Sequence, residues 1–148
     1  MAPIVESIEI SRPPDDVFSY ATDPSALPEW QESLVSVRPA GDEPVGVGSR
    51  FVMTRRVGSR ERDMTMELAE LERPRRWVAR GLDGPIRALV DGTIEPLGGG
   101  ERSRVTIALD FEGRGMGRLL VPLVVRRQAR AELPRNLRKL KERLEGGA

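Results

Sequence analysis

The chain has 148 residues, of which 39% are hydrophobic and 32% are charged, and its formal net charge is +1. These values favour one folded domain over residues 1–148 and argue against a disordered chain. The sequence contains no Cys and no His, which excludes disulfides, thiol nucleophiles, histidine-based catalytic triads and most transition-metal sites.

The N-terminal segment predicts one strand followed directly by two short helices. Residues 3–11 alternate, with isoleucines on one face and polar side chains on the other, which is typical of a strand. Ser11 is a typical helix cap, and the prolines and aspartates that follow it suit the first turn of a helix. Asp23-Pro24 ends that helix and begins a second one, which ends near Trp30.

Six further strands are predicted in the middle of the chain. They cover residues 34–37, 49–57, 63–71, 76–81, 86–95 and 104–111. Alternating side chains mark the longer ones, and turns that contain glycine or proline separate them. Because these connections are short, consecutive strands should pair in an antiparallel sheet, which makes the fold class α+β.

Residues 115–144 predict a long amphipathic helix that closes the chain. Its apolar side chains recur three or four positions apart. They are Met116, Leu119, Leu120, Leu123, Val124, Ala131, Leu137, Leu140 and Leu144. Pro134 lacks the N–H that a helix needs at this point, so we expect a kink or an interruption there. We expect the apolar stripe to lie on the sheet and to enclose a hollow.

The sequence offers no pattern typical of a membrane span or a metal site. No apolar run approaches the ~20 residues of a membrane-spanning helix, and the first residues do not resemble a secretory signal. We therefore expect a cytoplasmic protein. A metal would have to bind carboxylates alone, and these lack the spacing of an EF-hand loop, so we predict no metal and no cofactor.

Short motifs distributed along the whole chain carry a resemblance to a known superfamily. They are Pro14-Asp15-Asp16-Val17-Phe18, Asp23-Pro24 with Leu27-Pro28-Glu29-Trp30, Gly46-Val47-Gly48, Leu71-Glu72-Arg73-Pro74 and the closing helix over residues 137–144. With these motifs the chain resembles the START and Bet v 1-like (SRPBCC) superfamily, in particular its bacterial polyketide cyclase/dehydrase and lipid-transport group. The resemblance implies a helix-grip fold, in which a curved antiparallel sheet of about seven strands wraps around a long C-terminal helix, with two short helices after the first strand. It also implies a hydrophobic cavity, since members bind lipids, sterols, polyketides or plant hormones, and some catalyse cyclisation.

Side chains on the inward faces of the strands and of the final helix are the predicted ligand contacts. They are Trp30, Phe51, Met53, Met64, Met66, Leu68, Val90, Val105, Ile107, Leu120 and Val124. Methionine is flexible and polarisable, so the three methionines suit an adaptable apolar pocket. The alternative is an ordinary filled core, and for Trp30 a wedge that holds the short helices against the sheet.

Arg55, Glu70 and Tyr20 are the candidates for polar contacts or catalysis. Arg55 shares a strand face with Met53, so it would orient a ligand carboxylate or carbonyl, unless this end of the strand is simply solvated. Glu70 follows Met66 on the same face, where burial would raise its pKa and make it an acid or a base. Its alternative is a surface ion pair with nearby arginines. Tyr20 would either donate a hydrogen bond into the pocket or pack between helices.

We predict that the protein binds or carries a hydrophobic small molecule, lipid-like or polyketide-like, rather than catalysing a reaction. The first alternative is a polyketide cyclase or aromatase that folds and shields its substrate. The second is a peripheral protein that docks transiently on anionic membranes through its basic C-terminal helix. The basic residues are Arg126, Arg127, Arg130, Arg138, Lys139 and Lys141. The helix lacks interleaved aromatic residues, so no nucleic-acid partner is expected, and both a monomer and a homodimer are compatible with the sequence.

Overall fold

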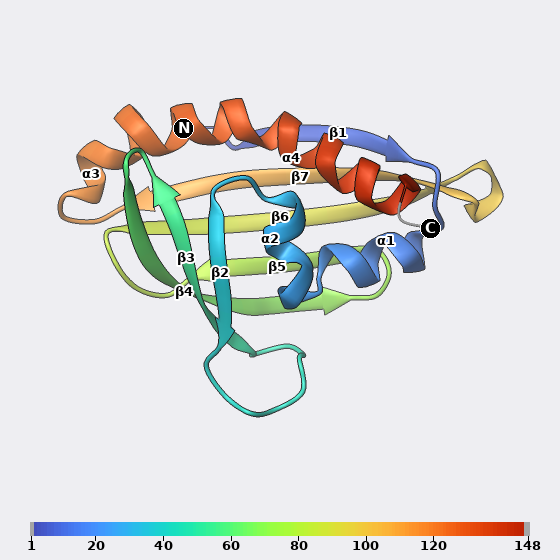
Figure 1. The fold of residues 1–148 in the computed structure, drawn as a ribbon, viewed down its shortest axis with the longest axis horizontal. Helices are drawn as coiled ribbons and strands as arrows, with labels where there is room; N and C mark the ends of the chain where they lie inside the picture. Colours follow the sequence, from blue (N-terminus) through green and yellow to red (C-terminus); the bar gives the residue numbers. More distant parts are fainter. Residues whose placement is uncertain (1, 147–148) are drawn as a thin grey trace.

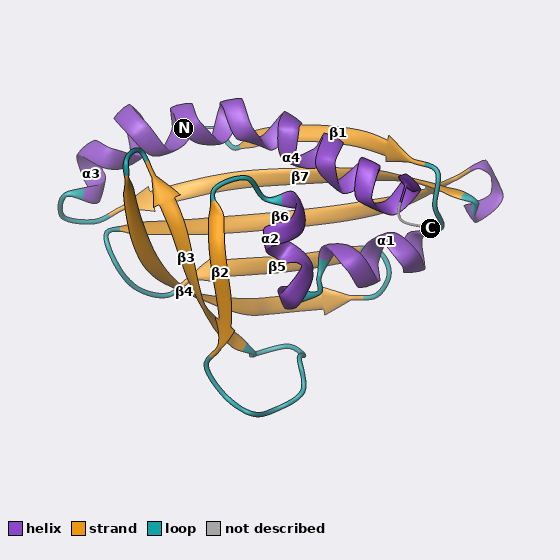
Figure 2. Cartoon of the chain, in the orientation of Figure 1, coloured by secondary structure: helices purple, strands orange, loops and turns teal. Residues whose placement is uncertain are grey.

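A seven-stranded sheet curves around the C-terminal helix in the computed structural model, which describes residues 2–146 (Figure 1). The strands are β1 (Ile4–Ile10), β2 (Leu34–Pro39), β3 (Arg50–Val57), β4 (Arg60–Glu72), β5 (Arg76–Gly81), β6 (Ile86–Leu97) and β7 (Arg102–Gly113). The helices are α1 (Pro14–Ala21), α2 (Leu27–Trp30), α3 (Gly117–Leu120) and α4 (Arg126–Gly146), with short turns η1 (Pro24–Ala26), η2 (Gly98–Gly100) and η3 (Val121–Val125). Helices α1, α2 and α4 lie over the same side of the sheet (Figure 2). Within residues 2–146, no helix has the length and apolar character needed to cross a membrane.

The order of strands in the sheet is β1-β7-β6-β5-β4-β3-β2, and every neighbouring pair is antiparallel. Strands β2 to β7 are neighbours in sequence order because short connections join them. Strand β1 is the exception, since it pairs with β7 and places Ile4 opposite Leu109. The sheet bends, so that β2 and β3 run across the direction of β6 and β7 (Figure 1). The predicted α+β helix-grip architecture, with two short helices after the first strand, is confirmed.

A tightly packed core lies beneath the C-terminal half of α4. Leu137 and Leu140 are almost completely buried there, in one cluster with side chains of α1 and of the central strands. Phe18 meets Trp77 edge to face, with ring centroids 6.3 Å apart and planes at 79°. The indole of Trp77 lies directly over Gly92, where an added Cβ would come within 2.2 Å of the ring. This cluster fastens α1 and α4 to the sheet.

A β-bulge in β4 changes which side chains of this strand face the helices. Met64, Met66 and Leu68 alternate inward and are buried. The register with β5 then shifts between Leu68 and Glu70, and a bulge of this kind reverses the alternation of the strand. Beyond it Leu71 packs against the core and Glu70 is exposed. The prediction that Glu70 continues the inward face of the methionines is therefore wrong.

The closing helix is divided by the π-helical turn η3, and its two parts bury different faces. A π turn takes up one residue more than an α turn, which shifts the face that meets the sheet. The buried side chains of α4 are Arg126, Ala129, Leu133, Leu137 and Leu140. Met116, Leu119 and Leu123 are exposed before it, and so is Ala131 within it, so the prediction that all four face the sheet is wrong. The helix continues through Pro134 without interruption.

Candidate ligand-binding site

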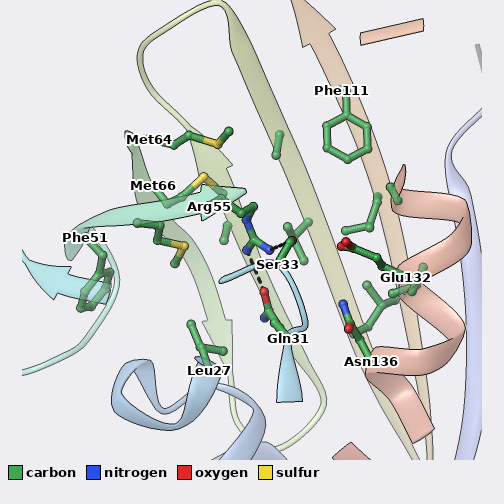
Figure 3. A pocket seen from close by; sticks show the side chains of 18 of the residues that line it. Leu27, Gln31, Ser33, Phe51, Arg55, Met64, Met66, Phe111, Glu132 and Asn136 are labelled. Carbon is green, nitrogen blue, oxygen red and sulfur yellow. Dashed lines mark hydrogen bonds between the residues drawn. The ribbon is translucent and has the colours of Figure 1, made fainter. Parts of the chain in front are cut away.

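A cavity of about 170 Å³ lies between the sheet, α2 and α4, next to the packed core (Figure 3). Most of its wall is apolar, and the sheet supplies the larger part of it. Eight of the predicted ligand contacts line this cavity: Trp30, Phe51, Met53, Met64, Met66, Leu68, Val90 and Ile107. The period-two alternation of β3, β4, β6 and β7 brings most of these side chains to one face.

The other three predicted contacts lie elsewhere. Val105 is fully buried in the core that joins α1 and α4 to the sheet, one alternation along β7 from Ile107. Leu120 and Val124 are half-buried and pack behind the cavity wall, in the cluster that contains Met64 and Val125. Val124 also lies against the turn between β3 and β4. From η3 it is Val125 that reaches the cavity wall. The shifted helix face at η3 explains why these two positions lie outside the cavity wall.

Arg55 is the charged side chain that β3 contributes to the cavity. It follows Met53 on the inward face of the strand, so this end of β3 is not simply solvated. Its Nη2 donates a hydrogen bond to Oε1 of Gln31 at 2.7 Å, and its Nη1 lies 3.4 Å from Oγ of Ser33. Both partners come from the link between α2 and β2 and are uncharged, so the guanidinium keeps its positive charge without a paired anion.

Glu132 on α4 faces Arg55 across the cavity. Figure 3 shows the two side chains pointing toward each other from opposite walls. Burial lowers the pKa of the Arg55 guanidinium, and the negative charge of Glu132 acts in the opposite direction. The ion pairs formed within residues 2–146 include neither of them. A donor group and an acceptor group therefore face the same space from two sides without contacting each other.

Glu132 belongs to a row of three polar side chains on α4. Gln128, Glu132 and Asn136 are spaced four residues apart, which places them on one face of the helix. Gln128 accepts a hydrogen bond from the Gly58 N–H at 2.9 Å and donates one to the Arg56 carbonyl at 2.8 Å. These bonds hold the β3–β4 turn against α4.

Asn136 plays the same part at the other end of the row. Its Oδ1 accepts a hydrogen bond from the Glu32 N–H at 3.0 Å. The neighbouring Arg135 pairs with the Glu32 carboxylate through two contacts of 2.8 and 3.2 Å, and this hydrogen bonding lowers the pKa of Glu32. These bonds hold the α2–β2 link to α4. Glu132 therefore lies midway between Gln128 and Asn136, the two side chains that attach α4 to the neighbouring loops.

Trp30 packs in the core cluster and also lines the cavity, so it fits both of its predicted roles. Its side chain is 4% exposed, and its Nε1 has no hydrogen-bond partner among residues 2–146. A buried N–H without a partner is unfavourable. Trp30 therefore leaves one buried donor unsatisfied in the core next to the cavity.

Tyr20 and Glu70 do not reach the cavity. The Tyr20 hydroxyl donates a hydrogen bond to Oε1 of Glu29 at 2.7 Å. Burial, together with this bond to a carboxylate, raises the pKa of Tyr20 to about 12. Glu70 is exposed and forms an ion pair with Arg76 at 3.4 Å, which is the alternative that the sequence offered for it.

Sequence reasoning missed Glu132, Gln31 and Asn136 as parts of the site. The signal for two of them was present, because polar residues repeat every fourth position of α4 directly beside its buried leucines. A carboxylate at the boundary between the buried and the exposed face of a helix points either into solvent or into a cavity. Which of the two applies to Glu132 depends on how α4 packs on the sheet. Among residues 2–146, the acidic side chains form no cluster that would bind a metal ion.

The fold and the cavity together define a helix-grip protein whose interior space has an apolar wall and one polar end. The sequence matches the family described as polyketide cyclase / dehydrase and lipid transport over residues 1–145, and the chain belongs to this family. No curated protein sequence matches it.

Solved structures of the same fold come from several bacteria. TTHA0849 from Thermus thermophilus superposes with a TM-score of 0.80 at 21% identity, covering 99% of each chain. A START superfamily protein from Mycobacterium smegmatis gives 0.78 at 14% identity, covering 100% of each chain. The Zhui aromatase/cyclase from Streptomyces sp. R1128 gives 0.75 at 17% identity, covering 96% of this chain and 94% of that one. At these identities the likeness establishes the START/Bet v 1-like fold and leaves the ligand open.

Proposed function

We propose that the protein binds and carries an apolar small molecule, lipid-like or polyketide-like, whose polar end includes a hydrogen-bond acceptor. The observation that carries this proposal is Arg55, a guanidinium with uncharged partners in a cavity of mainly apolar side chains. A ligand carbonyl or carboxylate oxygen would make a charge-assisted hydrogen bond there, which is stronger than a bond between neutral groups.

The size of the cavity limits the part of the ligand that it encloses. An apolar cavity of about 150 Å³ in another protein binds benzene, and this one has about 170 Å³. A single ring or a short branched chain therefore suits it. Met53, Met64 and Met66 line the wall, and their flexible side chains would let the space adapt to a somewhat larger molecule.

Two matched probes test the role of Arg55. Acetophenone has a ring and a carbonyl oxygen, whereas ethylbenzene has a similar shape without the acceptor. We expect both to shift NMR signals of cavity residues. Replacing the guanidinium by an apolar side chain, Arg55→Met, should weaken the binding of acetophenone by about tenfold or more. The same variant should bind ethylbenzene with unchanged or higher affinity. Arg56→Met is the control, because Arg56 is exposed and bonds the Glu32 carbonyl from the outer side of β3.

The probes also show what would contradict the proposal. If neither probe perturbs a cavity residue of the native protein, the cavity does not bind apolar molecules of this size. If Arg55→Met weakens both probes equally while its unfolding curve is native-like, Arg55 shapes the wall and does not recognise an acceptor. Mass spectrometry of an organic extract, against a matched blank, would identify the class of any molecule that copurifies.

A second function, the cyclisation of a polyketone, is supported by the position of Glu132 opposite Arg55 across the cavity. The Glu132 carboxylate would take a proton from the carbon beside a ligand carbonyl, and Arg55 would stabilise the resulting enolate oxygen. The enolate carbon would bond to a second carbonyl carbon of the same molecule. Glu132 would then return its proton to the alkoxide that forms, so that no other reactant is required.

The rate of ring formation from a linear β-triketone distinguishes this function from simple binding. A catalyst should lose nearly all of its rate over buffer with Glu132→Gln, whereas Glu142→Gln, an exposed carboxylate on the same helix, should retain it. A rate that does not exceed buffer, or one that Glu132→Gln leaves unchanged, would exclude Glu132 as the base.

A further inference from the structure

Three large apolar side chains form an exposed apolar row at the start of the closing helix: Met116, Leu119 and Leu123. They are 60%, 67% and 65% exposed. Their spacing of three and four residues places them on one face of the helix. Scattered apolar side chains on a surface are ordinary, but a contiguous group on one helix face is typical of an interaction site.

The charges around this row are almost all positive. Residues 113–131 contain five arginines and no acidic residue. Arg126 is buried and Arg114 pairs with Glu112 at 3.1 Å, which leaves Arg118, Arg127 and Arg130 exposed for an outside contact. Arg127 and Arg130 continue the same helix face beyond Leu123 and are exposed. Arg62 approaches from β4, with its Nη2 4.0 Å from Sδ of Met116. An apolar row next to exposed arginines fits a surface that is anionic outside and apolar beneath.

The opposite face of the same segment belongs to the interior. Val121 and Val125 are buried there, and Val125 lines the cavity. One short stretch of helix therefore has apolar side chains toward the cavity on one side and toward water on the other. A contact made at the outer face would lie one helix diameter from the cavity, roughly 10 Å.

We propose that this segment docks the protein on the surface of a membrane that contains anionic phospholipid. The exposed apolar row inserts at the boundary between head groups and acyl chains, and the arginines contact the lipid phosphates. A second copy of the chain fits less well, because a symmetric dimer would bring the same arginines together. Three side chains also cover far less than the roughly 1,200–2,000 Å² buried in a stable interface.

This location is narrower than the membrane-binding surface that the sequence offered as an alternative, the basic residues of the helix from Arg126 to Lys141. Arg126 is 3% exposed, and its Nη2 bonds the Ala2 carbonyl at 2.5 Å. Lys141 bonds the Glu9 carbonyl and the Glu145 carboxylate, at 2.8 and 2.7 Å. These two cations serve contacts within the protein, whereas Arg127 and Arg130 are exposed next to the apolar row and remain part of the docking surface.

Cosedimentation of the full chain with vesicles tests the proposal without any ligand, so it stands or falls independently of the proposed function. We expect binding to vesicles of phosphatidylcholine with phosphatidylserine at low ionic strength, and much weaker binding at high salt. The affinity of the double variant Leu119→Ser/Leu123→Ser for these vesicles should be lower than that of the native protein by about tenfold or more. The control Val45→Ser/Val47→Ser, which replaces two exposed apolar side chains elsewhere on the surface, should bind like the native protein.

Three results would overturn the proposal. The first is equal binding by the native chain and the Leu119→Ser/Leu123→Ser variant. The second is the absence of binding to the anionic vesicles under conditions where the native chain is folded. The third is a concentration-dependent dimer, measured by sedimentation velocity, that this double variant abolishes, because the row would then be an interface between copies of the chain.

Discussion

The two parts of the closing helix carry leucines at the same spacing but bury them differently. In α4, Leu133, Leu137 and Leu140 lie in the core and are at most 3% exposed. In α3 and the π turn η3, Leu119 and Leu123 repeat at a similar interval and face water. Periodicity shows that one helix face is apolar, whereas the surroundings of that face decide whether it is buried.

This difference separates stability from function within one element. The C-terminal part of α4 joins the helix to α1, β1 and the sheet. The part formed by α3 and η3 contributes one inner wall and leaves its outer leucines free of the core. Mutations in the first part should change the free energy of unfolding, and mutations in the outer face of the second should change binding.

Leu137→Ala and Leu123→Ala test this comparison most directly, and we expect the largest effect from the first. Leu137 is 1% exposed, so its truncation removes buried surface and leaves a cavity that costs about 2–5 kcal/mol of unfolding free energy. Leu123→Ala should stay within about 0.5 kcal/mol of the native protein. Urea denaturation measures both, and similar losses from the two variants would show that both parts of the helix support the fold.

Gly117→Ala tests how the outer part is attached, with an intermediate expected effect. A Cβ at Gly117 would lie 1.8 Å from the carbonyl oxygen of Pro85, so the helix start or the β5–β6 turn must move. We expect a loss of about 1–3 kcal/mol in unfolding free energy. Gly46→Ala is the matched control, since no atom lies within 4 Å of its added Cβ. Equal stability of the two variants would mean that α3 is not anchored at this point.

The pH dependence of stability tests the tether at the middle of α4, with the smallest expected effect. Arg135 lowers the pKa of Glu32 below its ordinary 4.5 in the folded state. The resulting stabilisation is present above pH 4.5 and is lost as the pH falls through the lowered pKa. Glu32→Gln should therefore show a shallower loss of stability on acidification than the native chain. Glu142→Gln should follow the native curve, and an identical curve for Glu32→Gln would exclude the tether as a source of stability.

The strands and the order of β2 to β7 could be predicted because they depend on local signals, whereas the pairing of β1 with β7 joins distant parts of the chain. Alternation and turn residues marked each strand, and short connections implied antiparallel neighbours. The bulge beside Glu70 could not be predicted in this way. It depends on how β4 pairs with β5, and one extra residue is enough to reverse the face of every side chain that follows.

The strand face that carries the apolar side chains and Arg55 could be predicted, whereas the choice between a solvated and an enclosed Arg55, and the rest of the polar end, could not. Arg55 follows Met53 by two residues, and the pleat of a strand alone places both on one face. The approach of Glu132 depends on how α4 sits across the sheet, as does the choice of Gln31 as a partner of the guanidinium. Contacts between elements so far apart in the chain leave no local pattern.

The amide side chains of Gln128 and Asn136 also give the protein two natural reporters of its own opening. Each bonds a single backbone N–H outside the helix, that of Gly58 and that of Glu32. Neither bond belongs to a strand ladder or a helix. The backbone N–H of Gly58 or Glu32 therefore exchanges its hydrogen with solvent when α4 separates from the loop beside it. The exchange rates of these two amides therefore record, at opposite ends of the polar row, how often the cavity is exposed.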